Sequence, residues 1–503
     1  MPIVSINRDL LYQNLGKSYT DEEFDELCFQ FGIEVDDIID EPEKGITLKI
    51  EVGANRYDLL CLEGISRALN IFLGNVQIPN YQLVPPKLPK KYRIIVKPNT
   101  AKVRPYVVGA VLRNITFTQS VYNSFIDLQD KLHQNIARKR TLVAIGTHDL
   151  DTIDGPFTYD AQPPKKITFI PLNRSENIKA DLLLEELSHD SHLREYVPII
   201  KDKPFYPVIR DRHGVVLSLP PIINGNHSKI TLKTKNVFIE CTATDQIKAQ
   251  IVLDTIVCMF SEYCEKPFTI EPVEVEYPNG KVVSYPVLES REVSTTVGFC
   301  NTIAGVEETG SSIAEYLTKM GVKASVAPDD GNKITVTVPP TRYDILHECD
   351  IAEDFAVAYG FDKLAKDMKM PQTDVVVKDK DPEATKGVGA RNERHLCAIN
   401  YNVRGNVEIV QGLLDNVMLA LKIPFSVDGV EESYHLEGKD HPTFFPGWCA
   451  DVLVGKVEVG RIGLLHPEVL ANFNLNNPAT LNKFVLYSRN ISFKLNENSN
   501  IER

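Results

Sequence analysis

The pattern of apolar and polar residues repeats itself at two distant places in the chain. The alternation over residues 48–52 predicts a strand, and it returns 286 positions later over residues 334–338. Each predicted strand leads into the tripeptide RYD, at Arg56 and at Arg342, and then into apolar residues with the 3,4 spacing of a helix. The two places therefore predict the same strand–turn–helix unit.

A second pair of matching segments lies upstream, at an offset three residues larger. Both segments have apolar residues at helical spacing and end at a glycine, which commonly follows a helix. Both also contain a capping-box pattern, beginning at Thr20 and at Ser312, which predicts that the helices start there. Together these matches predict two related helix–strand–helix modules, within residues 1–90 and 290–365.

Only the second module carries a cluster of acids after its RYD tripeptide. The first copy has Gly64, Arg67 and Ala68 at the corresponding places, so the fold does not require the acids. On a helical projection of residues 348–359, acids lie opposite an apolar arc. Such carboxylates suit a cation such as Mg²⁺, but acids also favour the start of a helix while facing solvent. Both interpretations remain open for Asp344, Asp350, Glu353 and Asp354.

Polar side chains gather where a predicted strand meets a predicted helix in the middle of the chain. The strand covers residues 237–242, and apolar residues with helical spacing follow it. Polar groups at such a junction either line a pocket or cap the helix, as Thr244 or Asp245 would. The sequence leaves both interpretations open, a pocket or a helix cap, for Ser218, Asn224, Glu240, Thr242 and Asp245.

Composition and charge narrow the class of protein. A length of 503 residues suggests about three domains. The net charge of −13 argues against non-specific coating of nucleic acid, although the three cations at 138–140 are either a solvated face or an RNA contact. No apolar run approaches the roughly 18 residues of a membrane span. The nine cysteines show no CxxC spacing, so neither a disulfide framework nor a zinc site is indicated. We expect a cytoplasmic protein without a membrane partner.

Several motifs together resemble one known family. They occur in order along the chain and are IEVGANRYDLLCLEGISRAL, HDLD, SLPPIING, FIECTATD, PPTRYDILHECDIAEDFAVAYG, FFPGWCADV and GLLHPEV. In these motifs the chain is similar to the β subunits of phenylalanyl-tRNA synthetase of the cytosolic type found in eukaryotes and archaea. The resemblance implies a multidomain α+β fold, in which the two modules flank an editing domain at 115–275. A truncated antiparallel core related to class II synthetases is expected to follow, at 392–495.

The resemblance also implies partners and a cofactor. Members of the family work as α2β2 enzymes that join phenylalanine to tRNA(Phe) with ATP and Mg²⁺, and the α subunit holds the catalytic pocket. We therefore expect no residue of this chain to catalyse aminoacylation. The family's magnesium ligands fall on the four acids of the second module, Asp344, Asp350, Glu353 and Asp354.

The middle domain of this family hydrolyses tRNA(Phe) that carries tyrosine by mistake. A pocket that accepts phenylalanine cannot strongly reject an analogue that only adds a hydroxyl, so a second site is needed. Glu240 and Thr242 match the acid-x-Thr element associated with recognition of tyrosine, and an oriented water is the expected nucleophile. The expected editing pocket consists of Ile209, Ser218, Asn224, Glu240, Thr242 and Asp245.

One segment departs from the family pattern. Residues 366–391 are charged and weakly periodic, and they join the second module to the later motifs without the first half of the core. A part of the core is therefore expected to be missing. This leaves two hypotheses for function, namely a working β subunit bound to α, and a free protein that retains only editing or RNA binding.

Overall fold

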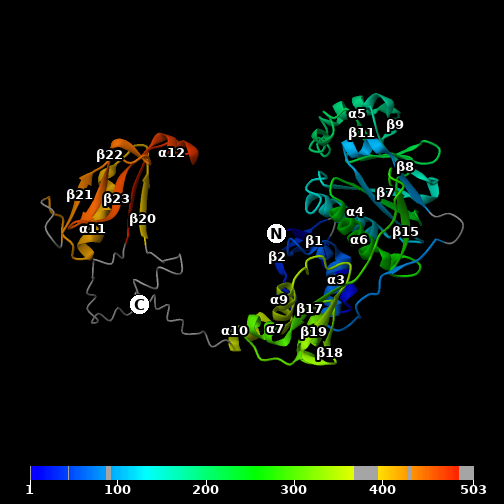
Figure 1. The fold of residues 1–503 in the computed structure, drawn as a ribbon, viewed down its shortest axis with the longest axis horizontal. Coiled ribbons are helices and arrows are strands. Elements are labelled where there is room, and N and C mark those ends of the chain that lie inside the picture. Colours follow the sequence, from blue (N-terminus) through cyan, green and yellow to red (C-terminus); the bar gives the residue numbers. More distant parts are fainter. Residues whose placement is uncertain (1, 43–44, 87–91, 368–394, 428–432, 486–503) are drawn as a thin grey trace. The chain divides into compact units, whose positions relative to one another are not determined.

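The structure is a computed structural model of the chain. It describes all residues except 1, 43–44, 87–91, 368–394, 428–432 and 486–503. Two compact units, Met1–Lys369 and Met370–Arg503, make up the molecule (Figure 1). Both contain helices and sheets, which agrees with the α+β class predicted from the sequence. Within the described residues, no helix is long and apolar enough to span a membrane.

The first module, residues 3–72, is a three-stranded antiparallel sheet with three helices. Its strands lie in the order β1-β3-β2, and the alternating apolar residues of β3 are buried. The expected capping box is present at the start of α2, where the Thr20 hydroxyl accepts a hydrogen bond from the Glu23 amide at 3.2 Å. The elements are β1 (Ile3–Asn7), α1 (Arg8–Leu15), α2 (Asp21–Phe31), β2 (Glu34–Glu41), β3 (Gly45–Glu51) and α3 (Leu62–Phe72).

The second module, residues 291–359, has the same order of elements and the corresponding strand order, β17-β19-β18. The capping box predicted at Ser312 is wrong. The helix begins one turn earlier, at Gly310, because the Thr309 hydroxyl accepts from the Ser312 amide at 3.2 Å. The elements are β17 (Arg291–Thr296), α7 (Val297–Ala304), α8 (Gly310–Lys319), β18 (Lys323–Ala327), β19 (Asp330–Val338) and α9 (Glu348–Tyr359).

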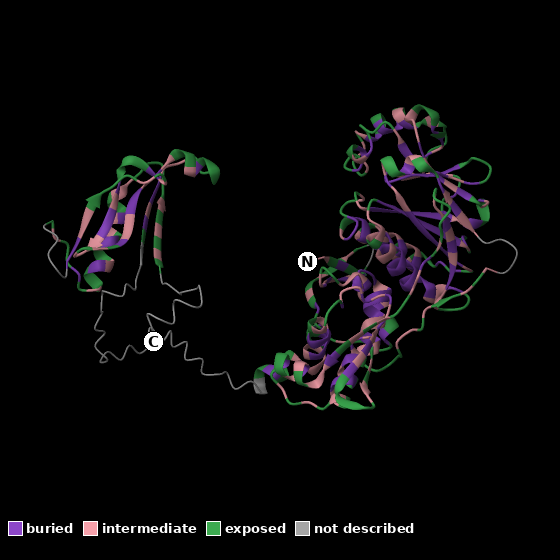
Figure 2. Ribbon diagram, viewed as in Figure 1, coloured by how far each residue is buried: buried purple, intermediate pink, exposed green. Residues whose placement is uncertain are grey.

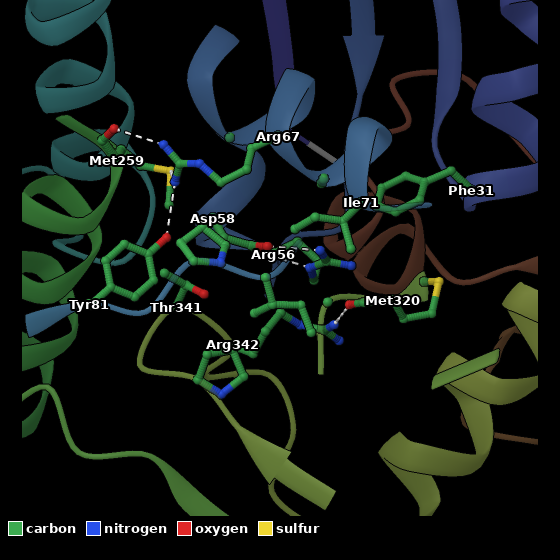
Figure 3. Close-up of a pocket in the computed structure, with 16 residues that line it drawn as sticks. Phe31, Arg56, Asp58, Arg67, Ile71, Tyr81, Met259, Met320, Thr341 and Arg342 are labelled. Atoms are coloured by element: carbon green, nitrogen blue, oxygen red, sulfur yellow. Dashed lines mark hydrogen bonds and ion pairs between the residues drawn. The ribbon is translucent and has the colours of Figure 1, made fainter. Parts of the chain in front are cut away.

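The two modules pack against each other through equivalent helices. Helix α2 contacts α9, and α3 contacts α8. A β-carbon on Gly32, at the end of α2, would lie 3.1 Å from Val357 Cγ1, so the helices approach closely. Arg56 and Arg342, from the two RYD turns, border one small cavity of about 40 Å³ in this region (Figure 3).

Between the modules in sequence lies a domain built on an eleven-stranded sheet. Its main path runs β13-β12-β11-β8-β5-β15-β6-β14-β7, and it includes strands on both sides of residues 115–275. Helix α6 packs on β6 and β14, and most residues of these three elements are buried (Figure 2). The strands that build the sheet are β4 (Gln82–Leu83), β5 (Arg93–Val96), β6 (Tyr106–Leu112), β7 (Val143–Asp149), β8 (Phe157–Gln162), β11 (Tyr206–Arg210), β12 (Val216–Leu219), β13 (Ile223–Asn224), β14 (Val237–Ala243), β15 (Thr269–Glu276) and β16 (Val282–Tyr285).

Helices and one small ribbon complete this domain. Helix α6 is capped by Asp245, whose carboxylate accepts from the Lys248 amide at 3.1 Å. This confirms one of the two caps predicted for that helix. The remaining elements are α4 (Gln119–Gln134), β9 (Thr168–Phe169), β10 (Ile178–Lys179), α5 (Ala180–Leu187) and α6 (Gln246–Phe260).

The second unit is a five-stranded antiparallel sheet in the order β20-β24-β23-β22-β21. Helix α11 buries Val410, Leu414 and Met418 on one face, while Ile409 and Leu413 are 54% and 44% exposed. Helix α10 (Phe361–Asp367) ends the first unit, and from residue 368 the junction expected at 366–391 lies outside the described residues. The elements of the second unit are β20 (His395–Tyr401), α11 (Val407–Ala420), β21 (Tyr434–Gly438), β22 (Phe444–Val454), β23 (Val457–Leu465), α12 (Pro467–Asn472) and β24 (Ala479–Val485).

Candidate functional site

A cavity of about 420 Å³ lies where the two ends of the middle sheet meet, since strands from both ends of its path line it. Its walls come from β7, β12, β13 and β14 and from the segment that follows α5. Apolar side chains such as Leu172, Leu193 and Ile222 alternate there with polar ones. Three residues of the expected editing pocket line this cavity, and these are Ser218, Asn224 and Glu240.

Glu240 is held between two glycines of the neighbouring strands. In the sheet it pairs with Gly109 of β6 on one side and with Gly146 of β7 on the other. A β-carbon on Gly146 would lie 2.2 Å from Glu240 Oε1, which is far inside contact distance. The carboxylate therefore lies across β7 at a place where a side chain would exclude it.

The two carboxylate oxygens of Glu240 have different surroundings. Oε1 accepts a hydrogen bond from the Ser218 hydroxyl at 2.8 Å, and His148 Nε2 lies 3.8 Å from the same atom. Oε2 is buried and has no hydrogen-bond partner within the described protein. Because Glu240 is only 1% exposed, this oxygen is a buried acceptor that a donor from a ligand would satisfy.

Two further expected pocket residues lie beside the cavity without lining it. Thr242 is two residues after Glu240 on β14, fully buried, and its hydroxyl oxygen has no partner within the described residues. Ile209 is also fully buried, on β11, where it pairs with Ser218 in the sheet. Both residues thus shape or support the strands that carry Ser218 and Glu240.

Asp245 does not belong to the cavity. It is the N-cap of α6, and its side chain is 38% exposed. The sequence places Asp245 near Thr242, but the chain enters α6 at Asp245, so its side chain caps the helix and does not line the cavity. Asn224, by contrast, lines the cavity, with its amide 3.4 Å from the carbonyl oxygen of Thr147.

The cavity also contains residues that the sequence did not single out for it. Arg140 lines the wall and donates to the Ile222 carbonyl at 3.0 Å, while its guanidinium lies 4.1 Å from the centre of the Tyr196 ring. Residues 138–140 all have positive φ, between 45° and 62°, so this basic run forms a left-handed turn. The sequence shows this run only as a cluster of charges, because its position beside the cavity depends on contacts between residues distant in sequence.

The four acids of the second module do not converge on one point. Asp344 and Asp354 both accept hydrogen bonds from the buried Arg342, at 2.7 Å and 2.8 Å from its Nη2 atom. Burial by itself would raise the pKa of Asp344, but the Arg342 charge outweighs it and holds this pKa below its ordinary value. Burial raises the pKa of Asp354, and Arg342 opposes that rise only in part.

The other two acids have separate surroundings. Asp350 accepts from the amides of Leu346 and His347 at 2.7 Å and 2.8 Å, which fixes the start of α9. Glu353 is exposed, so it does not share a face with the buried Asp354 as the helical projection indicated. No group of three or more His, Cys, Asp or Glu side chains in the described part of the chain is arranged to hold a metal ion. These residues do not fit a four-carboxylate magnesium site, which stays a prediction from the family.

Four family models match the chain. They are the B1 domain of the Phe-tRNA synthetase beta subunit at residues 1–75, the B3/4 domain at 91–265, the tRNA synthetase B5 domain at 293–361 and the CLM domain of the phenylalanyl-tRNA synthetase beta chain at 367–486. The matches define the chain as a subunit of an aminoacyl-tRNA synthetase.

Curated relatives narrow the family further. The phenylalanine–tRNA ligase beta subunits of Drosophila melanogaster and Mus musculus are 43% and 44% identical to this chain, with 97% and 95% of the chain covered and 99% and 98% of the relatives. The cytoplasmic beta subunit of Arabidopsis thaliana is 39% identical over 95% of the chain and 98% of its own length. The chain belongs to the family of phenylalanine–tRNA ligase beta subunits.

A solved structure supports the fold of the first unit. An N-terminal fragment of the phenylalanyl-tRNA synthetase beta subunit from Pyrococcus horikoshii has a TM-score of 0.65 and 30% sequence identity, and covers 71% of this chain and 99% of the fragment. The alignment with the Drosophila relative runs over 594 positions although it takes in 97% of only 503 residues here. That relative therefore has on the order of a hundred residues without a counterpart in this chain. That the missing residues belong to the core after residue 366 stays a prediction.

Proposed function

We propose that this chain is the β subunit of a cytoplasmic phenylalanine–tRNA ligase and acts with an α subunit and tRNA(Phe) in ATP-dependent charging of that tRNA. The family membership over almost the whole chain supports this role. The second unit also exposes apolar side chains on α11, including Ile409 and Leu413, which is typical of a surface that another chain covers.

We also propose that the cavity of the middle domain removes tyrosine from mischarged tRNA(Phe). The observation that carries this proposal is Glu240, which lines the cavity and whose buried Oε2 atom has no hydrogen-bond partner among the described residues. A tyrosine phenol donates a hydrogen bond to this acceptor, whereas a phenylalanine ring leaves the buried carboxylate unsatisfied. That loss is the physical basis for rejecting the correct product, Phe-tRNA(Phe).

Recognition and hydrolysis are then separate tasks. Glu240 and Ser218 hold the phenol end of the ligand, and the ester bond lies toward the mouth of the cavity. A water molecule attacks the ester carbonyl, with the terminal hydroxyl of the tRNA and nearby backbone donors orienting it. This division predicts that changes at Glu240 alter the choice of amino acid more than they alter the chemistry.

Deacylation assays on the full chain test this proposal. Glu240→Ala is expected to lower the preference for Tyr-tRNA(Phe) over Phe-tRNA(Phe) by roughly 10- to 100-fold, the range for a hydrogen bond to a charged group. The matched control is Asp245→Ala, which removes a helix cap at a cost of about 0.5–2 kcal/mol and leaves the preference unchanged. The reverse pattern, with Asp245 controlling selectivity and Glu240 not, contradicts the assignment.

The shorter chain supports a second candidate function. Because on the order of a hundred positions of the relatives have no counterpart here, the surface that binds α is incomplete if those positions contribute to it. The chain would then be a free deacylase. Co-purification with a co-expressed α subunit separates the two functions, since a stable complex contradicts the second and its absence contradicts the first.

A further inference from the structure

A groove of about 1080 Å³ lies between β1 of the first module and α4 of the middle domain. One wall is β1 and the turn that leads into α1. The other wall is a single face of α4, because the residues that line it recur every three or four positions. This face consists of Gln119, Asn123, Asp127, Asp130, Lys131 and Gln134. The groove is thus bounded by a strand on one side and by a polar helix face on the other.

Strand β1 presents an open main-chain edge to this groove. It stands at the end of the order β1-β3-β2, so β3 is its only partner among the described strands. The Ile3 carbonyl accepts a hydrogen bond from Nζ of Lys131 on α4, whereas the Pro2 carbonyl accepts from the Val52 amide at 3.1 Å, on the side of β3. Backbone groups of an antiparallel strand alternate in direction, so the N–H and C=O groups of Ile3 and Ser5 point into the groove.

The charges around the groove favour a basic ligand. Three carboxylates line it, those of Glu41, Asp127 and Asp130, against the single ammonium group of Lys131. A polyanion such as RNA is repelled by this balance, and a cationic segment is attracted. Apolar residues line the groove as well, and these are Leu10, Leu60 and Leu62. An extended chain has side chains on two alternate faces, so it offers apolar groups to one part of the lining and cations to the other.

We propose that the groove binds an extended, basic peptide segment of a partner chain, which pairs with β1 as a fourth strand of the first module's sheet. In this mode of recognition, main-chain hydrogen bonds provide affinity and alternate side chains provide specificity. The five residues of β1 match roughly 17 Å of extended peptide. Lys131 releases the Ile3 carbonyl when an N–H group of the peptide takes its place. This site is separate from the editing cavity and does not depend on the editing function.

A proline scan of the strand edge tests the main-chain pairing. The probe is a fluorescein-labelled hexapeptide of alternating lysine and valine, and fluorescence anisotropy measures its binding to the full chain. Ser5→Pro removes an N–H group that points into the groove and leaves the ladder to β3 intact, so we expect affinity to fall about tenfold. Ser5→Ala keeps the amide and should bind the peptide as the wild type does.

The second module supplies a matched control for Ser5→Pro. Ser294 on β17 pairs with Thr335 as Ser5 pairs with Lys49, which is the same register position in the repeated sheet. Both serines are exposed, but β17 does not line this groove. Ser294→Pro should therefore leave the affinity for the peptide unchanged.

Altered peptides make the test independent of how the variants fold. N-methylation of alternate peptide amides removes the donors that pair with β1 and should weaken binding about tenfold. A hexapeptide with glutamate in place of lysine should bind more weakly than the lysine peptide, and Asp127→Lys should narrow or reverse that order.

The results either support or overturn the site. Saturable binding that falls with Ser5→Pro and with N-methylation, but not with Ser5→Ala or Ser294→Pro, supports it. Slower amide hydrogen exchange at residues 3–7 on addition of the lysine peptide, with no change at residues 291–296, supports it as well. Absence of binding at roughly 1 mM lysine peptide, the weak limit of useful affinity, overturns it. Binding that is equal for the methylated and unmethylated peptides, or for the lysine and glutamate peptides, also overturns it.

Discussion

The first and second modules have the same fold and use it differently. In both, the arginine of the RYD turn pairs with the aspartate two residues later, Arg56 with Asp58 at 2.8 Å and Arg342 with Asp344 at 2.7 Å. The strands that precede these turns bury the same alternating positions. The two copies therefore share the features that the fold needs. These are alternating buried residues on the strand and a turn held by an Arg–Asp salt bridge.

The copies differ on the outer face of the helix that follows the turn. In the first module this face docks on the middle domain, because Glu63 accepts from the Ser124 hydroxyl at 2.6 Å and Arg67 contacts Glu262 at 2.5 Å. The corresponding residues of the second module, Cys349 and Glu353, are exposed. The same backbone thus carries an internal interface in one copy and an open surface in the other.

The largest expected difference between the copies comes from their buried arginines. Arg342→Met removes the hydrogen-bonded partner of both Asp344 and Asp354, and we expect it to lower the free energy of unfolding by about 3–5 kcal/mol. Arg56→Met removes the partner of a single carboxylate, Asp58, so its loss should be smaller. Urea unfolding of the full chain measures both, and adding Asp354→Ala to Arg342→Met should restore part of the stability. Equal losses for the two arginine variants would contradict this comparison.

The second comparison concerns the outer faces of α3 and α9. Arg67→Ala removes contacts to Glu262 and to the Met259 carbonyl, and a cost of about 1.5–3 kcal/mol is expected. Glu353→Ala, at the equivalent position, should change stability by less than about 0.5 kcal/mol. Unfolding in the presence of Mg²⁺ tests whether this face binds a cation. A cation held by Glu353 would raise the unfolding midpoint of the wild type and not that of Glu353→Ala.

The third comparison concerns the start of the two helices. A β-carbon on Gly64 would lie 1.8 Å from the Asp58 carbonyl oxygen, so Gly64→Ala forces the backbone apart at a cost of about 1–3 kcal/mol. Its counterpart, Asp350, caps α9 with its side chain, and Asp350→Ala should cost about 0.5–2 kcal/mol. Thermal unfolding of the two variants checks the ranking, and a stable Gly64→Ala variant would show that the close approach is unimportant.

The smallest expected effect depends on pH and concerns the attachment of the second module. Tyr343 donates a hydrogen bond to Asp254 of α6, and burial raises the pKa of Asp254 to about 7. Because the folded pKa is raised, the stability that Asp254 contributes is present at low pH and is lost as the pH rises through about 7. Asp254→Asn stays neutral, so it should be more stable than the wild type by about 1–2 kcal/mol above that pH and nearly equal well below it.

The repeated strands could be predicted from the sequence because burial on one face of a sheet imposes a two-residue period, as over residues 334–338. The local sequence does not fix the position of every helix cap. Thr309 and Ser312 are both natural caps, and only the packing of α8 decides between them. The acidic face could not be predicted correctly because a helical projection of α9 contains no information about Arg342, which turns Asp354 inward.

In the candidate pocket, some residues could be predicted from the sequence and others could not. Glu240, Ser218 and Asn224 could be named from residue type and motif, since a junction of strand and helix concentrates polar groups. Gly146 and His148 could not, because their relation to Glu240 depends on the register between β7 and β14. Register depends on how strands pair across the sheet, so the local sequence around residue 146 does not predict it.

The reciprocal packing of α2 on α9 and of α3 on α8 makes the two modules an internal dimer. Each module offers the other the same pair of helices, so the contact has the isologous form of a two-fold symmetric homodimer, here closed within one polypeptide. In a true homodimer a substitution alters both halves of the interface at once. Covalent linkage removes that constraint, so the outer face of α3 docks on the middle domain while Cys349 and Glu353 on the corresponding face of α9 stay exposed.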